Sequence, residues 1–179
     1  PTVPNAWELV ANNSTLMSNG VTANSNGGTV SCVASMSDRV LVSYDDEKEG
    51  ASLCSTTLLD YKASLNDSLT HVCFSKGLFL GKGTKISDSS AAEGGAISST
   101  LCAIEIFNTT IFNSTSFDGN GGAILVSTGS TLRVDDDTTF KDNTAAAGSG
   151  GGVSWKKCHT MTFNGGTNFQ NNVAKNKKM

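Results

Sequence analysis

A few residues in this chain of 179 have the types and spacing that catalysis or metal binding needs. Asp135-Asp136-Asp137 is the acidic cluster of the repeat region, and converging carboxylates can serve in acid–base chemistry or bind Ca²⁺. His159 follows Cys158, and His71 lies two residues before Cys73, so either pair could form a thiolate–imidazole nucleophile. Neither pair carries a local catalytic signature, and no C-x-x-C or H-x₃-H spacing predicts zinc. We therefore expect no enzyme activity, no metal and no cofactor.

The composition narrows the classes of protein further. Charged residues make up 16% of the chain and the formal net charge is −3, so no basic excess predicts binding to nucleic acid. No apolar run reaches the roughly 18 residues of a membrane-spanning helix. Short apolar strings such as Ala123-Ile124-Leu125-Val126 recur among abundant Ser, Thr, Asn and Gly, and Pro occurs only twice. This pattern predicts a folded chain that is rich in β-strands.

Two short motifs repeat along the second half of the chain. The first motif is a double glycine followed by small and apolar residues, at Gly94-Gly95-Ala96-Ile97, Gly121-Gly122-Ala123-Ile124 and Gly151-Gly152-Val153, with spacings of 27 and 30 residues. The second motif is Phe-x-x-Asn, at Phe117 and Asn120, Phe140 and Asn143, and Phe169 and Asn172, with Ile86-x-x-Ser89 in the corresponding place one repeat earlier. Motifs that repeat together indicate one structural unit per repeat.

A third pattern precedes the Phe or Ile that begins each copy of the second motif, a residue that we call the apolar anchor. A threonine stands two residues before the anchor, at Thr84, Thr115, Thr138 and Thr167. An apolar residue stands six before it, at Leu80, Ile111, Val134 and Phe163, and the three residues between this position and the threonine mostly have turn composition. Asp135-Asp136-Asp137 fills this turn in one repeat, which favours a solvated turn over a catalytic role for the cluster.

A period of 23 to 31 residues built from short strands and turns predicts an all-β protein, a right-handed parallel β-helix (a β-solenoid) with about three clear coils. We expect Phe117, Phe140 and Phe169 to form an internal aromatic column that ends at Ile86. The repeated asparagines would bend the chain and stack their amides, and the double glycines would form the next corner.

The N-terminal half is less regular. We expect residues 1–83 to form a cap and degenerate coils, with strands near 28–33, 40–43, 52–57 and 71–74, and residues 84–179 to form the β-helix repeats. Five cysteines suggest up to two disulfides, and the coil-like spacing of the first four favours Cys32–Cys54 or Cys54–Cys73 between adjacent coils, with Cys102 and Cys158 unassigned. Asn-x-Ser/Thr sequons occur at Asn12, Asn13, Asn66, Asn108 and Asn113.

The register of Gly-Gly-Ala-Ile with Phe-x-x-Asn, over residues 84–174, resembles the passenger domains of the chlamydial polymorphic membrane proteins. Repeated GGA(I/L/V) and FxxN tetrapeptides define that family. The resemblance implies an autotransporter passenger that is exported through the cell envelope and displayed as an adhesin, with the tetrapeptides involved in attachment to host cells. It also implies membrane attachment only through a C-terminal barrel outside this chain, so the chain is either a passenger fragment or a different secreted solenoid.

We therefore expect a non-catalytic adhesin at the cell surface or outer membrane, or secreted, that acts in virulence. Its expected partner is a host-cell surface protein or glycan, with possible self-association through the solenoid ends. Two alternatives remain open. One is a structural subunit that stacks end to end into an extracellular filament or envelope layer, and the other is a glycan-active enzyme with an acidic lateral groove.

Overall fold

The structure is a computed structural model that describes residues 7–11, 15–17, 22–33, 39–44, 59–65, 68–74 and 77–175, with side-chain surroundings for residues 27–33 and 77–175. Every regular element in these ranges is a β-strand. Within them, no helix is long and apolar enough to cross a membrane.

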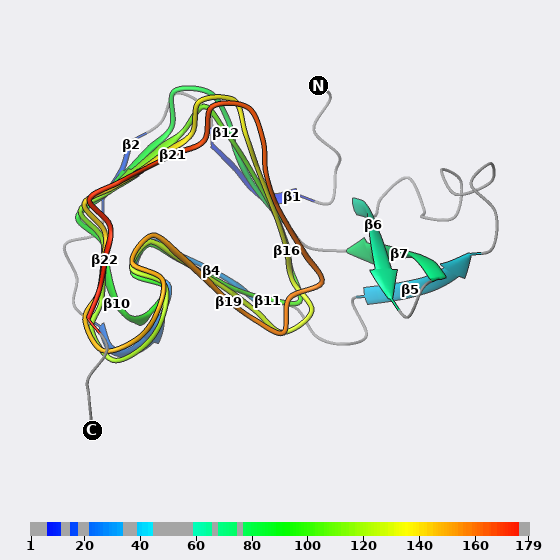
Figure 1. Cartoon of the computed structure of the whole chain (residues 1–179), viewed down its shortest axis with the longest axis horizontal. Helices are drawn as coiled ribbons and strands as arrows, with labels where there is room; N and C mark the ends of the chain where they lie inside the picture. Colours follow the sequence, from blue (N-terminus) through cyan, green and yellow to red (C-terminus); the bar gives the residue numbers. More distant parts are fainter. Residues whose placement is uncertain are drawn as a thin grey trace.

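Most strands wind into a β-solenoid whose coils superimpose when viewed along its axis (Figure 1). Four parallel sheets run along this solenoid, and we call them sheets A to D. Sheet A contains, in order, β1 (Trp7–Ala11), β8 (Gly77–Leu80), β12 (Ala103–Phe107), β16 (Thr131–Asp135) and β20 (Thr160–Phe163). Sheet B contains β2 (Thr15–Met17), β9 (Lys85–Ser87), β13 (Thr110–Phe112), β17 (Thr139–Lys141) and β21 (Asn168–Gln170).

Sheets C and D complete the cross-section. Sheet C contains β3 (Thr22–Asn26), β10 (Ser90–Glu93), β14 (Thr115–Ser116), β18 (Thr144–Ala145) and β22 (Val173–Ala174). Sheet D contains β4 (Val30–Val33), β11 (Ile97–Thr100), β15 (Ile124–Ser127) and β19 (Val153–Lys156). Three complete coils, β8–β11, β12–β15 and β16–β19, are therefore preceded by a coil β1–β4 and followed by strands β20–β22. The expected fold, an all-β parallel solenoid, is confirmed.

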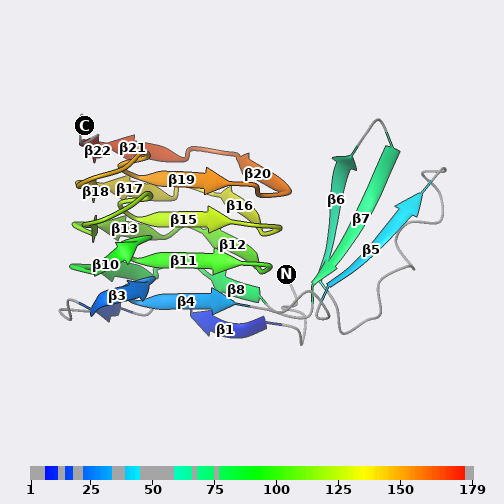
Figure 2. The same ribbon diagram turned by 90° about the horizontal axis from the view of Figure 1, so that it is seen from below.

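The first coil joins the stack directly. Strand β4 pairs in parallel with β11, and β2 pairs in parallel with β9. Between this coil and the next, the chain forms an antiparallel sheet from β5 (Arg39–Tyr44), β6 (Leu59–Leu65) and β7 (Ser68–Phe74), in the order β5-β7-β6. Figure 2 shows this sheet beside the solenoid rather than within the stack. The strands expected near 28–33, 40–43 and 71–74 correspond to β4, β5 and β7, and residues 52–57 lie outside the described residues.

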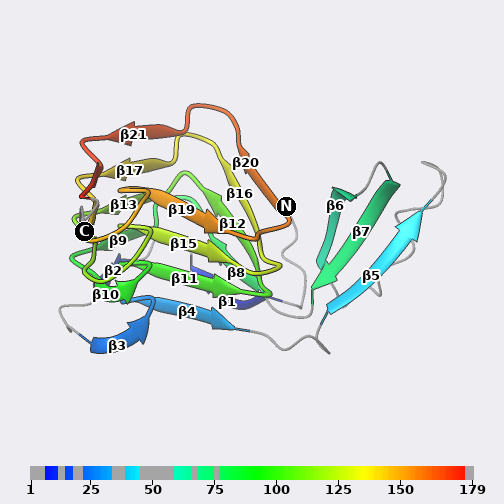
Figure 3. The ribbon, with the colours of Figure 1, turned by 60° about the horizontal axis from the view of Figure 1, so that its bottom comes forward.

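The strands of each sheet stack in order along the solenoid axis (Figure 3). The core inside them consists of apolar columns that run along this axis. Each column takes one inward-facing side chain from each strand of a sheet, because parallel strands in register place equivalent residues about 4.8 Å apart. One column follows sheet B through Ile86, Ile111, Phe140 and Phe169. A second follows sheet A through Leu80, Ile106, Val134 and Phe163, and a third follows sheet D through Val30, Ile97, Ile124 and Val153. The columns are continuous because each coil buries its apolar residues against the next coil.

The corner between sheets B and C has a left-handed residue in each coil from β9 onward. Its members are Asp88, Asn113, Asp142 and Asn171, with φ of 54°, 52°, 53° and 51°. Asn and Asp adopt this conformation more readily than other side chains, so the sequence supplies them where the chain turns. The bend therefore lies one residue before the repeated Asn143 and Asn172, which corrects the expectation that those asparagines form it.

The corner that leads into sheet D requires glycine. Gly94, Gly121 and Gly150 have φ of 60°, 71° and 69°, and a Cβ on Gly122 would lie 2.0 Å from the carbonyl oxygen of Gly151. The N–H of Gly122 donates to the carbonyl of Gly150, as the N–H of Gly95 donates to that of Gly121. The double glycine of the third repeat is therefore Gly150-Gly151, and Gly152 takes the place of alanine, one residue earlier than the sequence suggested.

Candidate functional site

The repeated asparagines form a hydrogen-bonded ladder at the corner between sheets B and C. Asn143 is fully buried, and its Oδ1 accepts a bond of 3.0 Å from the backbone N–H of Ser114. Its Nδ2 donates to the carbonyl of Ile111 at 3.0 Å and to Oδ1 of Asn172 at 2.9 Å. Asn172 repeats the arrangement one coil later, because its Nδ2 donates to the carbonyl of Phe140 at 2.8 Å. The ladder position is serine in earlier coils, at Ser89 and Ser114.

The aromatic column is shorter than expected. The rings of Phe140 and Phe169 stack with centroids 4.9 Å apart and an interplanar angle of 12°. Phe117 belongs to a different position, because it follows β14 and its N–H donates to Ala91 just as that of Ala146 donates to Ser116. The sheet B column instead contains Ile111 in this coil. The placement of Phe117 in the column was therefore wrong, and Asn120 is not a ladder residue.

The predicted threonine column also contains one residue that the structure places elsewhere. Thr109, not Thr115, aligns with Thr138, since the N–H of Thr139 donates to the carbonyl of Thr109. Thr115 lies on β14 and pairs with Ser90 and Thr144. The hydroxyls of the threonines at the turn bond within the turn and to the neighbouring coil: that of Thr138 donates to the carbonyl of Asp135 at 2.8 Å and accepts from the N–H of Thr109 at 3.4 Å. The sheet A column likewise passes through Ile106 instead of Ile111.

Most of the residues in the two tetrapeptide motifs lie inside the solenoid. The members with buried side chains or backbone are Gly94, Gly95, Ala96, Ile97, Gly121, Gly122, Ala123, Ile124, Phe140, Asn143, Gly151 and Gly152. The members at intermediate exposure are Phe117, Asn120, Val153 and Asn172, and Phe169 is exposed. A buried residue has almost no surface with which to contact a partner in the folded state, so most of the motif residues build the scaffold.

The acidic turn does not assemble a site. The Asp135 carboxylate is buried and accepts a 2.6 Å bond from Nε of Arg133, whereas Asp136 and Asp137 are exposed with φ of 48° and 51°. Across the residues with described side chains, no group of three His, Cys, Asp or Glu residues is placed to hold a metal ion. The turn positions the chain between sheets A and B.

Cys158 and His159 occupy the turn between sheets D and A. Cys158 carries a free thiol at intermediate exposure, and burial raises the pKa of this thiol above its ordinary value. A nucleophilic cysteine needs the opposite shift, because the thiolate is the reactive form. His71 and Cys73 lie on β7, whose side-chain surroundings fall outside the described residues.

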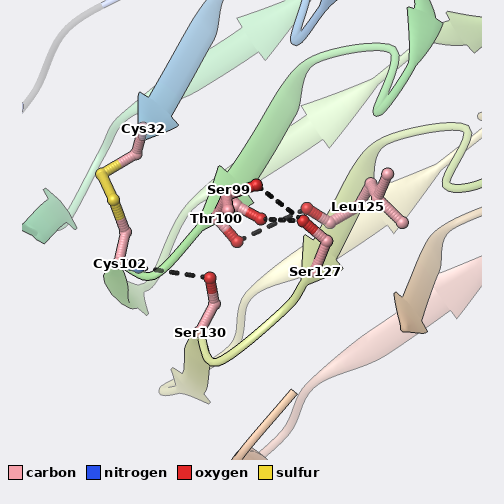
Figure 4. Close-up of a disulfide and its surroundings, with 7 residues drawn as sticks. All are labelled: Cys32, Ser99, Thr100, Cys102, Leu125, Ser127 and Ser130. Atoms are coloured by element: carbon pink, nitrogen blue, oxygen red, sulfur yellow. Dashed lines mark hydrogen bonds between the residues drawn. A yellow bond between two sulfur atoms is a disulfide. The ribbon is translucent and has the colours of Figure 1, made fainter. Parts of the chain in front are cut away.

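A disulfide joins Cys32 and Cys102, which are 70 residues apart in the chain with Cα atoms 6.1 Å apart (Figure 4). Cys32 lies on β4 of the first coil, and Cys102 follows β11 of the next coil. The pairing between adjacent coils is as expected, but the partner is Cys102 rather than Cys54, because the antiparallel sheet is inserted in the chain between the two coils.

Hydroxyl side chains continue this contact toward the following coil. The hydroxyl oxygens of Thr100 and Ser127 are 2.8 Å apart, and the Ser127 hydroxyl donates to the carbonyl of Ser99 at 2.6 Å. Figure 4 shows both contacts. The N–H of Cys102 donates to the Ser130 hydroxyl at 3.2 Å. The disulfide and these hydrogen bonds together join three successive coils near the C-terminal ends of the strands of sheet D.

No protein-family model, curated protein or solved structure matches this chain.

Proposed function

We propose that this protein is a non-catalytic adhesin that is displayed at a cell surface or secreted, and that attaches through the antiparallel sheet β5-β7-β6. The observation that carries the proposal is the insertion of this sheet between two coils of an otherwise regular stack (Figure 2). In repeat proteins, insertions that interrupt one repeat often form the binding face, because the repeats themselves are committed to stacking. The solenoid would then act as a rigid support.

Two features of the described residues support this role. Most residues of the tetrapeptide motifs are buried, so they stabilise the support and leave binding to elements outside the stack. The Cys32–Cys102 disulfide crosslinks the two coils from which the inserted sheet emerges, and disulfides are typical of secreted and surface proteins. The partner class that we propose is a host-cell surface protein or glycan.

The test is saturable binding of the labelled 179-residue chain to cultured animal cells, with excess unlabelled chain as competitor. A variant in which residues 39–74 are replaced by a short Gly/Ser linker should lose the saturable component. The matched control, Thr128→Asp, changes an exposed turn of the solenoid and should bind like the parent. Far-ultraviolet circular dichroism and thermal unfolding verify that both variants fold. Absence of saturable binding, or its retention after the deletion, would overturn the proposal.

A further inference from the structure

The outer face of sheet A carries an arginine whose surroundings are those of the side of the solenoid. Arg133 lies on β16, which pairs with β12 on one side and with β20 on the other. Figure 1 shows sheet A as one side of the cross-section. Leu132 and Val134, the chain neighbours of Arg133, both belong to the core. Because side chains alternate between the two faces of a strand, Arg133 points outward.

Two contacts hold the guanidinium of Arg133 in place. Its Nε donates to Oδ2 of Asp135 at 2.6 Å, and the Asp135 side chain is only 8% exposed. Its Cζ lies 5.6 Å from the ring centroid of Phe107, within the range of a cation–π interaction. The ring of Phe107 in turn contacts that of Phe79, with centroids 5.4 Å apart. Residues of three successive coils therefore build this arrangement.

The far side of the guanidinium is available to a ligand. The Arg133 side chain is 49% exposed, and among the described residues neither of its Nη groups donates a hydrogen bond. The two Nη groups form a planar fork that matches the two oxygens of a carboxylate. Because Asp135 and Phe107 already restrict the side chain, a ligand would order fewer rotamers here than at a mobile surface arginine.

We propose that Arg133 binds the carboxylate of an acidic sugar within a glycan. The surroundings favour an isolated carboxylate over a densely charged polyanion. Asp136 and Asp137 are exposed and directly follow β16, and Glu105, which has an interaction of its own, pairs in register with Arg133. Like charges placed opposite one another are unfavourable, so these acids disfavour a ligand with a charge on every unit. Carboxylates also accept hydrogen bonds from hydroxyl groups, which sugars carry in abundance.

A protein partner fits this face less well. Protein interfaces gain most of their binding energy from aromatic and other large anchors that become buried. The large apolar side chains that are exposed among the residues with described side chains all lie on other sheets, at Val33, Trp155, Phe169 and Val173. The residues that pair with Arg133 in the outer column, Glu105 and Thr162, are polar. This face therefore suits a ligand that is recognised through charge and hydrogen bonds.

This inference rests on the proposed function for the class of partner, a glycan. It adds a contact on the solenoid itself, outside the inserted sheet. A single exposed contact between an arginine and a carboxylate is weak in water. The inserted sheet would therefore still provide the saturable attachment to cells, and Arg133 would select for acidic sugars.

The test is ligand-observed saturation-transfer NMR at low salt with the 179-residue chain, using trigalacturonate and sialyllactose as acidic probes and maltotriose as the uncharged one. We expect transfer to at least one acidic probe and none to maltotriose. Arg133→Gln removes the charge and the fork and should weaken binding at least tenfold. Arg133→Lys keeps the charge without the fork and should weaken binding less. Lys156→Gln removes an exposed cation from sheet D and should bind like the parent.

Several outcomes would overturn the proposal. One is that neither acidic probe binds the parent chain, and another is that folded Arg133→Gln binds as tightly as the parent. Circular dichroism establishes that Arg133→Gln folds, and Arg133→Lys provides the comparison if it does not. Tighter binding of triglutamate would assign the face to acidic peptides, and tighter binding of heparin that is independent of Arg133 would indicate diffuse attraction. The assay contains no cells, so its result is distinguishable from that of the cell-binding test.

Discussion

Nδ2 of Asn143 donates a hydrogen bond of 2.9 Å to Oδ1 of Asn172, although the two residues are 29 positions apart in the chain. The same amide also contacts the backbone of the preceding coil, through Ser114 and Ile111. One side chain therefore joins three coils. A solenoid has no long-range contacts other than those between neighbouring coils, so the alignment of its coils depends on such groups.

Substitution Asn143→Ala should lower the free energy of unfolding. It leaves the N–H of Ser114 and the carbonyl of Ile111 buried without the partners they have in the native ladder, and each unsatisfied buried group costs about 1–3 kcal/mol. Urea denaturation followed by circular dichroism measures the change. Asn168→Ala is the matched control, because Asn168 is exposed on β21, and a loss of equal size in both variants would contradict a specific role for the ladder.

Substitution Phe140→Ala should cost about 3–5 kcal/mol, the range for deletion of a fully buried aromatic ring. Phe169 occupies the next position of the column but is 48% exposed, so Phe169→Ala should cost less than half as much. Both values come from chemical denaturation at a concentration where the protein is monomeric. A cost below about 1 kcal/mol for Phe140→Ala is incompatible with its place in the core.

Substitution Gly122→Ala should prevent or strongly impair folding of the solenoid. The added Cβ would lie 2.0 Å from the backbone carbonyl oxygen of Gly151, and neither backbone can move without separating two coils. Gly119→Ala is the control, because the nearest atoms there belong to the flexible side chain of Glu93. Thermal unfolding should show a much larger loss for Gly122→Ala, and comparable melting temperatures would refute the steric argument.

The solenoid and its apolar columns could be predicted because strand stacking requires equivalent residues once per coil. For one coil, however, the sequence did not predict which of its residues align with those of the neighbouring coils. The turn between Ile106 and Thr109 is one residue shorter than the turns of the neighbouring coils, such as that between Val134 and Thr138. A chance Phe-x-x-Asn beginning at Phe117 then matched the motif in the wrong frame, although its asparagine lies outside the ladder.

Other features had no local signal at all. The disulfide partner of Cys32 depends on how many residues are inserted between two coils, and composition does not distinguish an inserted antiparallel sheet from degenerate coils. The triple glycine Gly150-Gly151-Gly152 allows two alignments, and only the backbone hydrogen bonds select one. Sequence patterns thus indicate the repeated contacts of a solenoid better than its interruptions.

The thiol of Cys158 should react slowly with iodoacetamide at neutral pH. Burial raises its pKa, so the folded protein contains less thiolate than an unfolded chain at the same pH. The stabilisation from the neutral thiol is present below the unfolded pKa and is lost as the pH rises through the folded pKa. Mass spectrometry of the peptide that contains Cys158, with and without urea, gives the two rates. Faster alkylation in the folded state would contradict the direction of the shift.

The disulfide between Cys32 and Cys102 should hold the first coil onto the rest of the solenoid. A crosslink that closes a long loop typically contributes about 2–4 kcal/mol, and the inserted sheet makes this loop long. The double variant Cys32→Ser/Cys102→Ser should therefore unfold at lower urea concentration than the oxidised parent, and treatment with dithiothreitol should lower the parent to the same midpoint. Cys158→Ser, which removes a free thiol, should leave the effect of dithiothreitol unchanged. Peptide mapping without reduction should identify one crosslinked peptide that contains both residues, and a map that joins Cys32 to Cys54 instead would disprove this pairing.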